Sequence, residues 1–265
     1  MNILIPIKQV PETSNVKMDE ETGTMVRDGV ESIINPLDLY AIEIGIQLKE
    51  KYGGKITVIT MGPSSAEKSL REAIAMGCDD GILVSGKEFA GSDTWATSYC
   101  LASSIKEIAE FDLILAGERA TDGDTGQVGP GIASFLNIPL STYTSNIKEL
   151  GDNSIIVERL IEDGYETLKL PLPALLTVVK EISAPRLPTL RGKQKARKTE
   201  INFWSSENVK MDKEKLGLKG SPTRVVKIDH PKVSRNGKFV KALDEDSIPE
   251  AVNQLVDFLH KKEMV

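Results

Sequence analysis

The sequence predicts an α/β fold with a doubly wound, mostly parallel sheet flanked by helices, an antiparallel addition and an extended C-terminal arm. The first observation is that short apolar runs alternate with helical segments over roughly the first 140 residues, as βαβ units require. The second is that this alternation then gives way to a hairpin pattern and a long charged stretch of weak periodicity. A sheet that is parallel first and antiparallel later is therefore expected.

The expected parallel strands are short, apolar and bounded by Gly, Pro or charged residues, and they cover 2–7, 55–61, 81–85 and 111–116. Two antiparallel strands, 155–162 and 165–170, are joined at Asp163-Gly164, a dipeptide typical of tight turns. A further apolar strand is expected at 174–179.

The helices between these strands are predicted from their end signals. Ser64 and Glu67 have the spacing of a capping box, and Gly77 is placed to end the helix that follows. Ser92 or Asp93 is expected to cap the next helix. These signals place helices after the second and third parallel strands, as a doubly wound sheet requires.

The pattern divides the chain into a core domain at 1–184 and an arm at 185–265, which opens with Pro185-Arg186-Leu187-Pro188. The arm ends in an amphipathic helix, introduced by a capping-box spacing of Ser247 and Glu250. Its apolar residues recur at intervals of three and four, at Val252, Leu255, Val256 and Leu259. Since the arm has little core to cover, this helix is expected to pack on a partner or back across the domain.

Composition excludes several classes of function. The net charge of −6 argues against a nucleic-acid binder, which depends on Lys and Arg to neutralise phosphates. With only two histidines and two cysteines, Cys78 and Cys100, no metal site and no catalytic side chain are expected. The N-terminus lacks the pattern of a signal peptide, no apolar run is long enough to span a membrane, and unpaired cysteines suit the cytoplasm.

The most informative segment is the glycine-rich loop, residues 117–131, in which five of fifteen residues are glycine. It follows a predicted strand and opens into a helix, so backbone N–H groups and the helix dipole favour an anion there. Asp122 and Asp124 suit ribose hydroxyls or adenine amines better than phosphates. The loop fits neither a Walker A nor a Rossmann pattern, so it is either an ordinary connection or a site for a nucleotide with a diphosphate.

Two further segments qualify as functional, each with a simpler alternative. Asn35 precedes the first long helix, where its ordinary role is to cap that helix. The run 191–198 holds five basic residues, which indicate either a nucleic-acid or anion patch or a solvated charged loop. The net charge of the chain argues against nucleic acid, and the exposed Leu190 beside the run suggests a docking site for another protein.

Four segments together resemble the β subunit of electron transfer flavoproteins. They are IPIKQVPET at 5–13, INPLD at 34–38, ATDGDTGQVGPG at 120–131 and the region 158–201. The resemblance covers essentially the whole chain, and its motifs are long and ordered.

The resemblance implies a heterodimer with a larger α subunit that carries its own FAD. In electron-bifurcating or confurcating members, the β subunit binds a second FAD and exchanges hydride with NAD(H). Such members split or join electrons between ferredoxin and a flavin dehydrogenase of the lactate or acyl-CoA type. The composition DGDTGQVGP favours this type, although Gly126 stands where such relatives often carry Ala. The alternatives are a housekeeping-type β subunit that binds AMP structurally and a non-redox adenine-nucleotide-binding α/β protein.

Site residues carried over from the family fall into two groups. The cofactor-binding group would line the nucleotide half of the flavin, and it comprises Pro6, Asn35, Asp38, Met61, Thr94, Ala120, Thr121, Asp122, Gly123, Asp124, Thr125, Gly126, Gln127, Val128, Gly129, Pro130 and Gly131. The partner-docking group would contact the dehydrogenase, and it comprises Leu187, Thr189, Leu190 and Arg191.

Overall fold

The structure is a computed structural model that describes residues 1–12, 31–108, 110–226, 237 and 239–264. The chain divides into two compact units, Met1–Val226 and Lys227–Val265, which are described separately.

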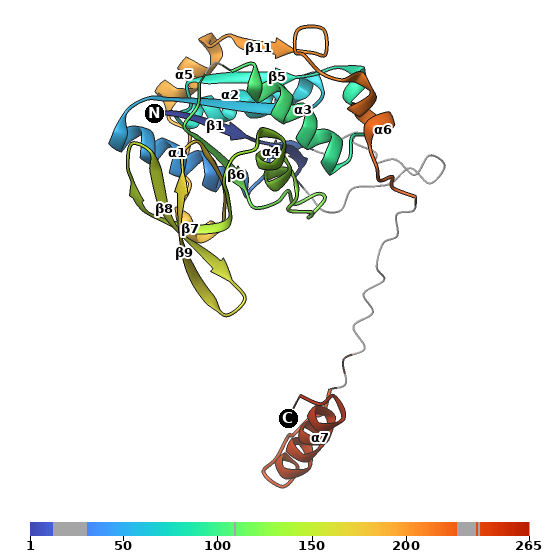
Figure 1. Cartoon of the computed structure of the whole chain (residues 1–265). Coiled ribbons are helices and arrows are strands. Elements are labelled where there is room, and N and C mark those ends of the chain that lie inside the picture. The colour runs from blue at the N-terminus through green and yellow to red at the C-terminus, as the bar shows by residue number, and fades with distance from the viewer. Residues whose placement is uncertain (13–30, 109, 227–236, 238, 265) are drawn as a thin grey trace. The chain divides into compact units, whose positions relative to one another are not determined.

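The first unit is built on a nine-stranded sheet with the order β11-β5-β4-β1-β6-β10-β7-β8-β9 (Figure 1). Neighbouring strands from β11 to β7 are parallel, whereas β8 and β9 continue the sheet as an antiparallel hairpin. The predicted α/β fold with an antiparallel addition is therefore confirmed. The strands are β1 (Asn2–Pro6), β4 (Lys55–Met61), β5 (Asp80–Val84), β6 (Leu113–Gly117), β7 (Leu140–Leu150), β8 (Ser154–Ile161), β9 (Gly164–Pro171), β10 (Ala174–Val178) and β11 (Ile201–Trp204), and a separate antiparallel pair is formed by β2 (Gln9–Pro11) and β3 (Ser32–Ile34).

Helices cover both faces of this sheet, because successive strand side chains point to opposite faces. Ile3 and Ile5 of β1 join one apolar core, and Leu4 between them joins the other. The first core includes side chains of α1 (Asp38–Tyr52), α2 (Glu67–Met76) and α5 (Leu190–Lys198), and the second includes those of α3 (Thr94–Lys106) and α4 (Val128–Leu136).

The order of the strands creates a switch point beside β1. From β1 the chain builds outward through β4 and β5, and then returns to place β6 on the opposite side of β1. The connections that leave the carboxyl ends of β1 and β6 therefore diverge, and the crevice between them is where open α/β sheets bind ligands.

Helix ends agree only in part with the sequence signals. Asp93 caps α3, because its carboxylate accepts the N–H groups of Trp95 and Ala96, both at 3.0 Å. The capping box at Ser64 is wrong, since residues 64–66 form a 3₁₀ turn and α2 begins at Glu67 without a side-chain cap.

The first unit extends beyond the expected boundary at residue 184. Residues after it form α5 and the edge strand β11, which pairs in parallel with β5. The basic run is thus helical rather than a loop. Its sequence gives little sign of this because Ala196 is the only buried residue of α5. The strand β7 was also missed, because polar residues interrupt its alternation.

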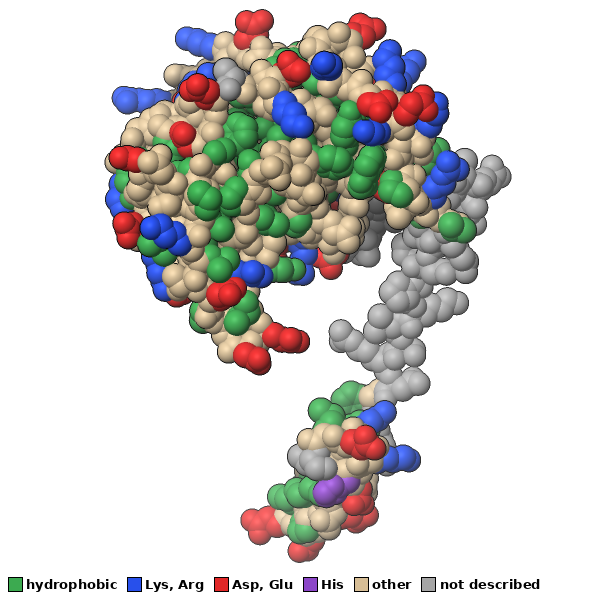
Figure 2. Space-filling model, in the orientation of Figure 1, with side chains coloured by type: hydrophobic (Ala, Val, Ile, Leu, Met, Phe, Trp, Pro, Cys, Tyr) green, Lys and Arg blue, Asp and Glu red, His purple; other side chains and the backbone are tan. Residues whose placement is uncertain are grey.

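The second unit contains α7 (Ile248–Lys261), which starts at the expected place with Pro249 in its first turn. Its capping box is wrong, because the Ser247 hydroxyl donates to the Asp244 carbonyl at 2.9 Å. Ile248, Val252, Leu255 and Phe258 are exposed, and Figure 2 shows hydrophobic side chains on the surface of this helix. Among the described residues no helix combines the length and the apolar character needed to cross a membrane.

Candidate functional site

The glycine-rich loop leaves β6 at the switch point and leads into α4. A side chain at Gly117 would collide with the carboxylate of Asp38 and the backbone of Leu37, so glycine lets the start of α1 pack under the loop. Asp124 and Gly126 both have left-handed backbones, with φ of 53° and 62°. The loop is thus tightly curved, and the start of α1 packs against it.

Asn35 fixes the loop through its side chain. The amide group donates to the carbonyl of Arg119 at 2.9 Å, and the amide oxygen accepts the N–H of Thr121 at 3.2 Å. Asn35 is buried, and the residue that caps α1 is Leu37, with no side-chain hydrogen bond. The simpler interpretation of Asn35 as a helix cap is therefore wrong, and its role is to position the loop.

Asp38 lies beneath the same loop and ties three elements together. Its carboxylate accepts the backbone N–H of Lys8 at 2.7 Å and the side-chain amide of Asn35 at 3.0 Å. Burial raises the pKa of Asp38 to about 7, although the hydrogen bonds from Lys8, Asn35 and Gly117 act to lower it. Asp38 is buried, and through these contacts it supports the loop from the interior of the protein.

Three ion pairs involve side chains of the loop. Lys8 Nζ lies 2.7 Å from Oδ1 of Asp122, which joins the segment after β1 to the loop after β6. Arg119 Nε lies 2.9 Å from Oδ1 of Asp124 and 3.6 Å from Oε1 of Glu118. Burial raises the pKa of Glu118, and Arg119 acts in the opposite direction. Lys8 and Arg119 were not predicted as site residues, although each comes directly after a predicted strand or near its end.

The last four residues of the predicted segment, Val128 to Gly131, form the first turn of α4. A Cβ atom at Gly129 would lie 2.7 Å from Cγ2 of Thr177, and one at Gly131 would overlap Ser98. These two glycines therefore let the start of α4 pack closely on β10 and α3. The positive end of the α4 dipole lies at the loop, and Val128 and Gly129 supply the N–H groups there, because Pro130 has none and the Gly131 N–H donates to the Gln127 carbonyl at 2.9 Å.

The remaining cofactor candidates lie at the same edge of the sheet. Thr94, the first residue of α3, donates its hydroxyl to Gln127 Oε1 at 3.3 Å, so the starts of α3 and α4 meet. Pro6 and Met61 are the last residues of the neighbouring strands β1 and β4. Ala120, Thr125 and Pro130 belong to the loop itself or to the first turn of α4.

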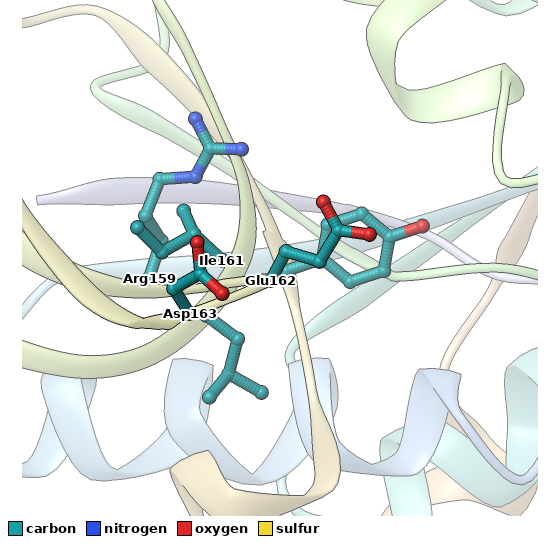
Figure 3. A pocket seen from close by; sticks show the side chains of 6 residues that line it. Arg159, Ile161, Glu162 and Asp163 are labelled. Atoms are coloured by element: carbon teal, nitrogen blue, oxygen red, sulfur yellow. The ribbon is translucent and has the colours of Figure 1, made fainter.

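A groove of about 610 Å³ adjoins the loop at the end of the β8–β9 hairpin (Figure 3). Tyr143 links the two features, because it lines the groove and its hydroxyl is 3.9 Å from the position of a Cβ at Gly126. Tyr143 sits at a bulge of β7 with φ of 55°, and its N–H donates to Thr177 Oγ1 at 3.1 Å. Sequence reasoning missed Tyr143, since a bulge leaves no clear signal in a single sequence. The other residues lining the groove are Arg159, Leu160, Ile161, Glu162 and Asp163.

The predicted docking residues lie at the start of α5: Leu187 and Thr189 precede the helix, and Leu190 and Arg191 are its first two residues. Leu187 and Leu190 are 85% and 81% exposed, and Arg191 is exposed as well. Thr189 caps α5 by accepting the N–H of Gly192 at 2.9 Å. Two exposed leucines thus lie next to the basic residues of α5.

The cysteines lie apart from this site, and the histidines lie in the second unit or outside the described residues. In the described ranges, no group of three or more His, Cys, Asp or Glu could hold a metal ion. Cys78 and Cys100 are buried core residues as expected, and burial raises the pKa of each to about 12. His260 is exposed, whereas His230 lies outside the described residues.

The fold and site together define an α/β protein with a tightly supported glycine-rich loop at the switch point of its sheet. A family model described as the electron transfer flavoprotein domain matches residues 22–208. The chain therefore belongs to the electron transfer flavoprotein family.

Several curated relatives match the chain over nearly its whole length. The electron transfer flavoprotein subunit beta of Thermoanaerobacterium thermosaccharolyticum is 46% identical, with 100% of both chains covered. The caffeyl-CoA reductase-Etf complex subunit CarD of Acetobacterium woodii is 43% identical, again with 100% of both covered. The acryloyl-CoA reductase electron transfer subunit gamma of Anaerotignum propionicum is 39% identical, with 97% of this chain and 98% of that protein covered.

Proposed function

We propose that this chain is the β subunit of a heterodimeric electron transfer flavoprotein of the bifurcating or confurcating type. The observation that carries the proposal is the loop at the switch point, which is bent at two left-handed residues and held by Asn35. The match over the full length of a relative named as a β subunit supports the same role.

The proposed cofactor of this site is FAD, and the residues present fit its nucleotide half. Gly123 faces open space, and the start of α4 supplies backbone N–H groups for a diphosphate. Thr94, Thr121, Thr125 and Gln127 would bind the ligand through hydroxyl and amide groups. Bound FAD would supply hydride exchange with NAD(H) and one-electron transfer. The protein itself would orient the ligand and tune its surroundings.

The proposed partners are an α subunit with its own FAD, ferredoxin and a flavin dehydrogenase of the acyl-CoA or lactate type. The names of two relatives, which refer to caffeyl-CoA reductase and acryloyl-CoA reductase, favour the acyl-CoA type. The surface around Leu187, Thr189, Leu190 and Arg191 would dock the dehydrogenase. The free, buried cysteines suit a reducing cytoplasm, which is the proposed compartment.

The competing proposal within the family is a β subunit that holds AMP structurally, since the same loop can bind the AMP part of either ligand. The two are separated by extracting nucleotides from the purified heterodimer and recording its visible spectrum. Two FAD per heterodimer are expected, with flavin reduction by NADH. One FAD and one AMP would overturn the bifurcating proposal, and a colourless protein unable to bind FAD would overturn the redox role altogether.

A further inference from the structure

The loop that would hold a diphosphate is itself acidic. Residues 120–131 contain Asp122 and Asp124 and no Lys or Arg. Backbone N–H groups and a helix dipole attract an anion, but two carboxylates within the same loop oppose it. Positive charge must therefore reach the site from outside residues 120–131.

Two cations contact residues 120–131: Lys8 comes from the segment after β1, and Arg119 comes from the start of the glycine-rich loop itself. Lys8 follows β1 and pairs with Asp122 at 2.7 Å, and Arg119 precedes the turn and pairs with Asp124 at 2.9 Å. Each aspartate is thus paired with one basic side chain.

Lys8 is held through both its backbone and its side chain. Its backbone N–H donates to the buried Asp38, and its ammonium donates to Asp122, both at 2.7 Å. The side chain is still 49% exposed, and an ammonium has three donors, so Asp122 leaves donors available to a ligand. The side chain of Arg119 is 46% exposed, and a guanidinium has five N–H donors, so Arg119 likewise retains donors beyond its contact with Asp124.

We propose that Lys8 and Arg119 are the phosphate-binding cations of this site, each held ready by one aspartate of the loop. The inference rests on the proposed nucleotide site but holds equally for FAD and for AMP. A bound phosphate group would share the ammonium of Lys8 with Asp122 and the guanidinium of Arg119 with Asp124. The aspartates thereby orient the cations, and the cations cancel the repulsion that the aspartates would exert.

The alternative is that Lys8 only fastens the loop to the end of β1. The two roles differ in how they respond to the charge of the ligand. A fastening role would weaken every adenine ligand alike, whereas a phosphate-binding role would act only on ligands that carry phosphate. Adenosine, AMP and ADP therefore form the required series of probes.

The experiment uses the heterodimer purified with its α subunit and freed of the nucleotide on the β subunit. Calorimetric titrations with adenosine, AMP and ADP are compared for the wild type, Lys8→Met and Arg119→Met. Each substitution is expected to weaken ADP binding about tenfold and adenosine binding less than about twofold. Added salt should reduce the effect on ADP.

Two further variants sharpen the test. Lys68→Met removes an exposed lysine that pairs with Glu31 at 2.9 Å, and it should leave all three affinities unchanged. Glu118→Gln removes a carboxylate that competes for Arg119, so it should strengthen ADP binding. Equal losses for adenosine and ADP, or no loss with ADP, would overturn the inference. Flavin content is not part of this measurement. Finding AMP on the β subunit would therefore overturn the bifurcating proposal but would leave the inference about Lys8 and Arg119 intact.

Discussion

Arg186 and Glu43 form a bidentate ion pair, with Nε 2.8 Å from Oε2 and Nη2 2.9 Å from Oε1. The Glu43 side chain is only 4% exposed on α1, and the backbone N–H of Arg186 donates to it as well. Burial alone would raise the pKa of Glu43, but hydrogen bonds from Arg186 and Gln47 hold that pKa below its usual value. This pair fastens the segment that carries Leu187 to the core.

Replacing Arg186 by Ala should therefore destabilise the protein. A carboxylate that is almost fully buried would lose its partner, which we expect to cost about 2 kcal/mol, reduced from a fully buried pair because Arg186 is 33% exposed. Urea unfolding near neutral pH measures this loss, and the exposed Arg191→Ala is the control. Because the folded-state pKa of Glu43 is lowered, the stabilisation is present above its unfolded pKa and disappears as the pH falls through the folded value. A loss that stays constant into acid would contradict this assignment.

Leu190→Ala should weaken electron transfer with the partner dehydrogenase without changing flavin content. The side chain is 81% exposed, so its removal costs little folding energy but deletes an apolar contact to a partner. A rise in KM for the dehydrogenase of about tenfold is expected in a coupled assay. Leu218→Ala, which truncates another exposed leucine on α6 (Gly217–Gly220), is the control. Unchanged coupling in Leu190→Ala would remove this segment from the docking surface.

The sequence predicted the parallel core well because its strands are buried on both faces. The run 113–116 is apolar and buried at every position, and the run 55–61 buries Ile56, Val58, Ile59 and Thr60. The strands β7 and β11 were missed for the opposite reason. β11 is an edge strand, and β7 is the last strand of the parallel region before the β8–β9 hairpin. Only some of their residues are buried, and polar and apolar residues do not alternate regularly along them.

The location of the loop could be inferred from sequence, but its supporting contacts could not. Strand–loop–helix order places residues 117–131 at the carboxyl edge of the sheet, whatever their tertiary partners. The pairing of Lys8 with Asp122 joins residues 114 positions apart and depends on β6 returning beside β1. Likewise, Asn35 has the local signal of a helix cap, and only the fold shows that its amide is used by Arg119 and Thr121.

The buried carboxyl of Asp38 should give the protein a measurable dependence of stability on pH. Its folded-state pKa is raised from 3.8 to about 7, so the native state binds a proton more tightly than the unfolded state. Stability should therefore fall as the pH rises from about 4 to about 7, by at most about 1.4 kcal/mol per pH unit.

Asp38→Asn provides the comparison, because it removes the titration while keeping the shape of the side chain. It loses one acceptor for the N–H of Lys8 or the amide of Asn35, and that cost does not vary with pH. The difference in unfolding free energy between wild type and variant should thus shrink from about pH 4 to about pH 7. A difference independent of pH would show that Asp38 is ionised throughout.

Gly129→Ala should push the start of α4 away from β10 and so weaken both folding and nucleotide binding. The new Cβ would lie 2.7 Å from Cγ2 of Thr177, a contact too close to exist without movement. We expect a net loss of about 1 kcal/mol, since overpacking outweighs the better helix propensity of Ala. Gly123→Ala, whose Cβ meets nothing within 4 Å, should change stability by less than about 0.5 kcal/mol.

Thr177→Ser tests the cause of that loss directly. It removes the methyl group that obstructs the Cβ but keeps the hydroxyl that accepts the N–H of Tyr143 at 3.1 Å. In the Thr177→Ser background, Gly129→Ala should therefore cost little or become stabilising, and ADP affinity should recover with it. Urea unfolding and calorimetry on the four combinations give the coupling energy between the two positions. Additive losses would mean that Gly129 is required for backbone access to the ligand rather than for packing against Thr177.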